Sequence, residues 1–173
     1  LRSSKRLGIV ALFKKSNLEP IKVRSEDLQF QIIPKLNAVG RIGDPLDAVR
    51  LLVTDSEKVA DKYAQKITQV NEDRKDMSNQ ITGLAEKQIK VKGGNCSIQW
   101  AVGEGWHEGI IGIVASKISH QYNKTSVIIT KKADVSTGSI RVVGDFSIVS
   151  LLEKLDDQLI KYGGHDKAAG FSI

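Results

Sequence analysis

The stretch GEGWHEGIIGIVASK, residues 103–117, decides the fold, because it carries the chain from a predicted strand into a predicted helix. Residues 97–102 before it have the composition of a strand. Apolar residues at helical spacing predict a helix over 109–122, and SVIIT at 126–130 predicts a second strand. A strand, a helix and a strand of these lengths are typical of a parallel crossover pair, so the fold class is α/β.

Further elements are predicted on both sides of this pair. A third strand is predicted over 139–143, a helix over 147–162 and a final strand over 168–173. Upstream, residues 55–92 predict one long helix, with a break at Lys92-Gly93-Gly94-Asn95. Its apolar positions recur in steps of three and four, which is typical of a coiled-coil strand or a spacer between globular parts. The positions of this seam, of which Arg74 is the one polar member, are Ala60, Tyr63, Ile67, Val70, Arg74, Met77, Ile81 and Leu84.

The first part of the chain is predicted to be helical, with one irregular segment. Helices are expected over 5–16 and from Ser25, and Pro34 is expected to interrupt the second one. We expect a bend over 34–43, because that stretch is rich in Gly and Pro, and then a short helix opened by Asp44-Pro45. Three polar residues share the bend, and they either tie it together or contact a substrate: Lys35, Asn37 and Arg41.

Composition excludes several classes of protein. The 173 residues include 40% hydrophobic ones, which excludes a disordered chain, and no run of about 18 apolar residues predicts a membrane span. The single cysteine excludes a disulfide framework and a cysteine zinc site, and it fits a cytoplasmic setting. The formal charge of +6 is compatible with a polyanionic partner or with a solvated surface. The first residue is not Met, so we expect a piece of a longer polypeptide.

The glycines at 103 and 105 follow a strand and open a helix, as in a dinucleotide-binding loop. Glu108 stands where the third glycine would be, and its carboxylate would repel a pyrophosphate, which excludes a nicotinamide or flavin cofactor. The helix start could still hold one phosphate, with His107 donating to it. The alternative is that His107 packs in its loop.

Two further groups suit phosphate chemistry. Ser139 and Arg141 share one face of a predicted strand, and a hydroxyl beside a guanidinium suits phosphate oxygens. The alternative is a polar strand face directed at solvent. Gly163 and Gly164 permit positive φ and close backbone approach, and they are expected to present His165 from a tight turn.

Four motifs together carry a family resemblance. Residues 33–41 (IPKLNAVGR), 105–117 (GWHEGIIGIVASK) and 163–170 (GGHDKAAG) resemble motifs of the RecJ single-stranded-DNA-specific exonucleases, within the DHH phosphodiesterase superfamily. Asn71 and Arg74 on the long helix match that family's N-x-x-R. The motifs occur in family order and cover nearly the whole chain. The last one is shared with other DHH phosphodiesterases.

The resemblance implies an architecture for the C-terminal portion of such an enzyme. Residues 1–54 would be the C-terminal helical part of a DHH domain, 55–92 the long interdomain helix, and 93–173 a DHH-associated α/β domain with a mixed sheet. A cleft would separate the two domains. The family's catalytic Mn²⁺ or Mg²⁺ ions are held by Asp-His-Asp and Asp-His-His motifs, which this sequence lacks. The resemblance thus implies no metal ligand in this chain.

The resemblance implies that this part grips the substrate of a 5′→3′ exonuclease. Phosphates of single-stranded DNA would be bound by Lys35, Asn37, Arg41, Ser139, Arg141, Gly163 and Gly164. His107 and His165 would support catalysis beside the scissile phosphate. It further implies a cytoplasmic monomer in DNA repair or recombination, with a single-strand-binding protein as a partner.

The sequence departs from the family pattern near two of these groups. Lys35 replaces the usual Arg and loses its bidentate fork. Val142 stands where the family usually has Ser, and the segment 135–137 before Gly138 lacks the family's Lys. Two alternatives stay open: a DHH phosphodiesterase for oligoribonucleotides or cyclic dinucleotides, and a non-catalytic pair of domains that binds DNA or a partner.

Overall fold

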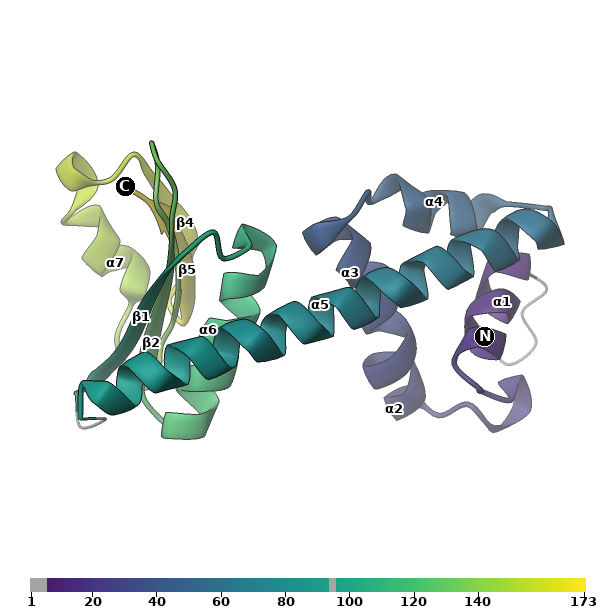
Figure 1. Cartoon of the computed structure of the whole chain (residues 1–173), viewed down its shortest axis with the longest axis horizontal. Coiled ribbons are helices and arrows are strands. Elements are labelled where there is room, and N and C mark those ends of the chain that lie inside the picture. The colour runs from purple at the N-terminus through teal and green to yellow at the C-terminus, as the bar shows by residue number, and fades with distance from the viewer. Residues whose placement is uncertain (1–5, 94–95) are drawn as a thin grey trace. The chain divides into compact units, whose positions relative to one another are not determined.

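The computed structural model describes residues 6–93 and 96–173 (Figure 1). Two compact units make up the chain, Leu1–Asp76 and Met77–Ile173, and the long helix α5 (Glu57–Val91) contributes to both. The predicted helix break continues into Gly94 and Asn95, which lie outside the described residues.

The first unit is helical. Its apolar core includes the fully buried Leu12, Phe13, Leu51 and Ile67. Gly8 permits close packing between the first and fourth helices, since a Cβ at this position would lie 1.9 Å from the carbonyl oxygen of Leu51. The elements before α5 are α1 (Leu7–Lys15), η1 (Pro20–Lys22), α2 (Ser25–Asp27), the π-helical turn η2 (Leu28–Ile32), α3 (Ile33–Ile42) and α4 (Leu46–Val53).

The predicted bend at 34–43 is wrong, because these residues form α3. The helical backbone continues without a break from Ser25 through Pro34, which directly follows the π-helical turn η2, so the predicted interruption at Pro34 is also wrong. Asp44 behaves as predicted: its Oδ1 accepts a hydrogen bond from the Leu46 amide at 2.9 Å, at the start of α4.

The long helix is confirmed, but its buried seam differs from the predicted one. Met77 and Leu84 are exposed, whereas the polar Asn71 and Ser78 are buried. Small residues at several buried positions let neighbouring elements approach the helix closely, so its seam is not that of a leucine-type coiled coil. The buried positions are Ala60, Ala64, Ile67, Asn71, Ser78, Ile81, Ala85 and Ile89.

The second unit is built on a five-stranded mixed sheet in the order β1-β2-β3-β5-β4. The pair β1–β2 is parallel, as predicted, and the other three pairs are antiparallel. Its elements are β1 (Ile98–Glu104), α6 (Glu108–Tyr122), β2 (Thr125–Lys131), β3 (Thr137–Arg141), α7 (Ile148–Glu153), η3 (Asp156–Gln158), β4 (Lys161–His165) and β5 (Ala168–Ser172).

Helices α6 and α7 cover opposite faces of this sheet (Figure 1). On the α6 face, the Ser126 hydroxyl donates to the Ala115 carbonyl at 2.6 Å. On the α7 face, Ile148 and Leu152 pack with Ile140 and Ala169. Because α6 packs on β2 and β3 while α7 packs on β4 and β5, the α6 face of the two last strands is left open.

The predicted helix over 147–162 is too long. Ser147 caps α7 as its side chain accepts from the Ser150 amide, but the helix ends at Glu153, and Tyr162 lies in β4. Tyr162 packs against the apolar cluster beneath α7, and the two glycines after it have low helix propensity. Tertiary pairing with β5 therefore determines the conformation of this segment.

The free edge of β1 is protected by the last turns of α5. The Gln88 side chain donates to the Val102 carbonyl at 2.7 Å and accepts from the Val102 amide at 3.1 Å. Both backbone groups that an added strand would use at this position are thus occupied.

Candidate functional site

Ser139 and Arg141 lie side by side on the α6 face of β3, as their spacing predicts. Nη1 of Arg141 donates to Oγ of Ser139 at 3.2 Å and to the carbonyl of Ile140 at 2.7 Å. A Cβ at Gly112 of α6 would lie 3.2 Å from that Oγ and 3.3 Å from Nη2 of Arg141. The glycine thus gives the helix room to pass over the pair without displacing either side chain.

The strands next to this pair expose very small residues on the same face. Ser139 lies opposite Gly170 of β5, which lies opposite Gly163 of β4. A Cβ at Gly163 would have no neighbour within 4 Å, so the face above it is open. A hollow of about 260 Å³ lies here, lined by Thr137, Lys161, Tyr162, Gly163, Gly170, Phe171 and Ser172.

Gly164 fulfils the expectation of positive φ and close backbone approach. Its φ is +151°, and a Cβ would lie 2.2 Å from the carbonyl oxygen of Ala168. The expected tight turn is displaced, however: Gly163, Gly164 and His165 all lie in β4, because this segment pairs with β5.

In both candidate histidines, Nδ1 accepts a hydrogen bond from a backbone amide two residues further along the chain. Nδ1 of His107 accepts from the Gly109 amide at 3.1 Å and so caps α6, a role that was not predicted for it. Nδ1 of His165 accepts from the Lys167 amide at 3.3 Å. An accepting Nδ1 carries no proton, so in each neutral ring the proton is on Nε2, which becomes a hydrogen-bond donor.

Glu108, in the first turn of α6, interacts with two lysines, Lys132 and Lys161. Its carboxylate pairs with Nζ of Lys132 at 2.5 Å. The hydrogen bond from Lys132, with smaller contributions from Thr137 and Lys161, lowers the pKa of Glu108 and keeps it ionised. The first turn of α6 therefore already holds a carboxylate, which disfavours a phosphate at the helix end itself.

In the first unit, Asn37 and Arg41 are exposed one turn apart on α3, whereas Lys35 is buried. Nζ of Lys35 donates to the Ser16 hydroxyl at 2.5 Å, and that hydroxyl donates to the Leu12 carbonyl. Burial, followed by the nearby Lys75, lowers the pKa of Lys35. Lys35 thus joins α3 to the end of α1, on a different side of the helix from Asn37.

Arg74 adds a second guanidinium near Arg41. Nη2 of Arg74 donates to the buried Asn71 at 3.0 Å. Burial, and then the charge of Arg41, lowers the pKa of Arg74, with Glu72 opposing it. Two guanidinium groups that repel each other favour an anion between them. Arg74 is not among the predicted site residues, although its match to the N-x-x-R motif is a signal for it.

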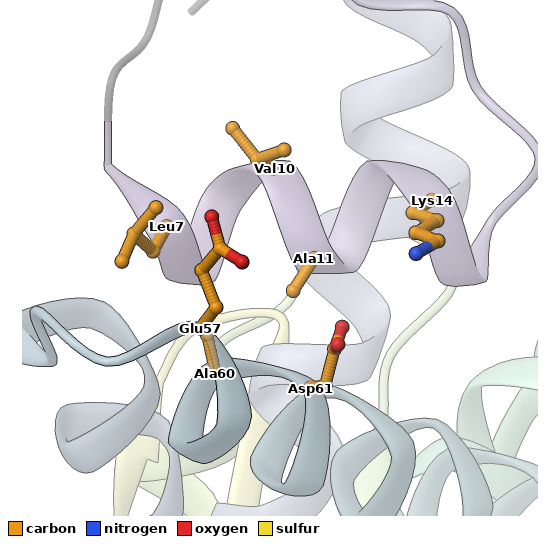
Figure 2. A pocket seen from close by; sticks show the side chains of 7 residues that line it. All are labelled: Leu7, Val10, Ala11, Lys14, Glu57, Ala60 and Asp61. Carbon is orange, nitrogen blue, oxygen red and sulfur yellow. The ribbon is translucent and has the colours of Figure 1, made fainter.

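A different hollow of about 180 Å³ lies between α1 and α5 (Figure 2). Glu57 and Asp61 of α5 stand at its rim with Lys14 of α1, while Val10 points away from α5. Two carboxylates against one ammonium make this hollow unsuited to a phosphate group.

The described residues do not fit a metal centre: residues 6–93 and 96–173 contain no group of three or more His, Cys, Asp or Glu side chains that could hold an ion. Over the same residues, no helix combines the length and the apolar composition that crossing a membrane requires.

Comparisons with known proteins define the class of the second unit. The model of the DHHA1 domain family matches residues 90–173, which include the whole sheet with α6 and α7. This part of the chain is a DHHA1 domain.

The chain is similar to RecJ proteins over its whole length. Over 175 aligned residues that cover all of it, it is 32% identical to the "single-stranded-DNA-specific exonuclease RecJ" of Bacillus subtilis, and it is 31% identical to the Escherichia coli protein of the same name over 97% of its length. The crystal structure of RecJ with Mg²⁺ from Thermus thermophilus matches 99% of the chain with a TM-score of 0.86 at 25% identity. The chain spans 22% and 31% of the two curated relatives and 26% of the Thermus chain.

Proposed function

We propose that this chain is the substrate-gripping part of a RecJ-type 5′→3′ exonuclease on single-stranded DNA. The observation that carries the proposal is the Ser139–Arg141 pair next to an open face of glycines. A hydroxyl and a guanidinium at hydrogen-bond distance offer several donors to one phosphate, and the glycines let a strand come close to the sheet. The names of the relatives support DNA as the polyanion.

The other candidate residues have distinct roles in this proposal. Arg41 with Arg74 binds a further phosphate, and Asn37 donates from the same exposed face of α3. Lys35 is buried, and it adds positive charge to this part of the phosphate-binding site without contacting the phosphate directly. His107 and His165 donate from Nε2 to phosphate oxygens near the scissile bond. Gly163 and Gly164 have no side chains, so the DNA strand can come close to the sheet at these positions.

The domain boundaries are part of the proposal. Residues 1–54 are assigned to the C-terminal end of a DHH domain, 55–92 to the interdomain helix and 93–173 to the DHH-associated domain. Phosphodiester hydrolysis is assigned to Mn²⁺ or Mg²⁺ held outside this chain, since the described residues do not fit a metal; the Mg²⁺ and Mn²⁺ complexes of Thermus RecJ support this assignment. The fragment alone is expected to bind without cleaving.

The cellular setting is proposed from the same resemblance. We assign the intact protein to DNA repair or recombination in the cytoplasm, as a monomer that works with a single-strand-binding protein. The family resemblance supports each of these assignments.

The proposal is tested on the full-length protein that contains this chain. Cleavage rates are compared for a long single strand of DNA, a dinucleotide and a cyclic dinucleotide. A preference for the long strand, with release from the 5′ end, is the expected result. A preference for either short substrate would favour a DHH phosphodiesterase instead, and binding of DNA without cleavage would favour a non-catalytic role.

A further inference from the structure

An exposed face on α3 and the turn before it carries more than the two polar residues discussed above. We call it the α3 face and define it by Phe30, Ile33, Asn37, Gly40 and Arg41. All five are exposed, Phe30 to 70% and Ile33 to 48%. One helical surface thus changes from aromatic and apolar at its start to amide and guanidinium at its end.

The core of the first unit does not need this face. The neighbouring Ile32, Ala38 and Val39 supply the buried contacts of the same segment, each less than 5% exposed. Phe30 lies within the π-helical turn Leu28–Ile32, a conformation that is rare in proteins and frequent at functional sites. An aromatic ring left in solvent by such a turn is available to a ligand.

The polar surroundings of Phe30 suit an anionic chain. Asp27, the nearest carboxylate in sequence, already accepts from the Arg24 amide at 2.9 Å and from Nε2 of Gln31 at 3.0 Å. At the other end of the face, Arg41 lies close enough to Arg74 to lower its pKa. The charge of the face therefore becomes more positive from Phe30 toward Arg41.

We infer that Phe30 is a base-stacking residue, which holds a nucleobase of the same strand whose phosphate Arg41 binds. This inference rests on the proposed function. Arg41 follows Phe30 by eleven positions, about 16 Å at 1.5 Å per residue, which exceeds the 3.4 Å rise of one stacked nucleotide several times. The contact is thus made to a different nucleotide from the one at Arg41.

Stacking on Phe30 would also favour single strands. An aromatic ring stacks on any base, so the contact tolerates every sequence, and a base inside a duplex is already stacked on both sides. Ile33, one turn away, extends the apolar surface beneath the base.

The test measures binding of the 173-residue chain to two probes of equal length and charge, a 12-nucleotide oligothymidylate and a 12-unit abasic oligomer. Phe30→Ala is expected to weaken binding of oligothymidylate by about 5- to 100-fold and to leave binding of the abasic oligomer and both salt slopes unchanged. Phe30→Tyr should restore binding. Ile21→Ala removes an apolar side chain that is 82% exposed in η1, off the α3 face, and is the matched control.

The outcomes separate this inference from the proposed function. If the unaltered chain binds both probes and Phe30→Ala binds them as the unaltered chain does, the inference is wrong and the proposed function stands. An equal loss for both probes would also overturn it, because stacking requires a base. If the unaltered chain binds neither probe, the proposed function fails and this inference fails with it. Circular dichroism and thermal melting check that the variants are folded.

Discussion

The side chain of Arg141 donates a hydrogen bond to Oγ of Ser139 at 3.2 Å, and Gly112 of α6 stands directly over the two. Two elements that are separate in the sequence, β3 and α6, thus meet at one guanidinium. The geometry makes the position of this group depend on the absence of a side chain at 112.

Gly112→Ala tests that dependence. The added methyl would lie 3.2–3.3 Å from Ser139 and Arg141, so both side chains must move by a few tenths of an ångström. We expect affinity for single-stranded DNA to fall by up to about 2 kcal/mol, the worth of one hydrogen bond to a charged group. Gly83→Ala is the control, since a Cβ there meets nothing within 4 Å. It should leave DNA binding unchanged and stabilise α5 by about 1 kcal/mol, measured by urea unfolding.

His107→Asn separates the capping role of this residue from its proposed role near the phosphate. Asparagine is a good N-cap, so the free energy of unfolding should stay close to that of the unaltered chain, while His107→Ala should lose about 1 kcal/mol. Cleavage by the full-length protein should fall in both variants, since both lack the Nε2 donor. Full activity of His107→Asn would show that the histidine acts only as a cap.

The Glu108–Lys132 ion pair makes a small, pH-dependent contribution to stability. The pKa of Glu108 is lowered in the folded state, so its contribution is present above the ordinary carboxyl pKa of 4.5 and is lost as the pH falls through the folded-state pKa. Lys132→Met should therefore reduce stability at pH 7 by about 0.5 kcal/mol, because the pair is exposed, and the difference should shrink below about pH 4.

The control for this pair is Lys131→Met, which changes the adjacent lysine. Thermal unfolding is followed from pH 3 to pH 8 for both variants. A difference between Lys132→Met and the unaltered chain that stays constant over this range would contradict the assignment.

Gly8→Ala tests the packing of the first unit. A Cβ at this position would lie 1.9 Å from the backbone oxygen of Leu51, which cannot move aside without moving α4. We expect a loss of about 3 kcal/mol in the free energy of unfolding, as for severe overpacking. Gly40→Ala, on the open side of α3, should instead be neutral or stabilising.

Much of the fold could be predicted because its signals are local. The alternation of side chains along a strand predicted that Ser139 and Arg141 share a face, and the periodicity of the long helix predicted an element that the structure has as Glu57–Val91. The parallel pair β1–β2 followed from the lengths of the segments between them.

The predictions failed where the conformation or role of a residue depends on its neighbours in space. Pro34 was expected to interrupt a helix, but the helical backbone passes through it directly after the π-helical turn Leu28–Ile32, a local irregularity that periodicity does not reveal. The segment around Tyr162 has helical spacing, but pairing with β5 makes it a strand. The nearness of Arg74 to Arg41 and of Gly112 to Arg141 depends on how separate elements pack, so periodicity could not predict either.

The central claim is that Arg41 and Arg141 bind phosphates of a single strand of DNA. Its most direct test is the salt dependence of affinity for a 5′-phosphorylated oligothymidylate, measured for the unaltered chain, Arg41→Ala, Arg141→Ala and the control Lys154→Ala. We predict that each arginine variant binds more weakly and that its slope of log K against log salt is shallower by about 0.7, as expected when one phosphate contact is lost. Unchanged affinity and slope in both arginine variants would contradict the account.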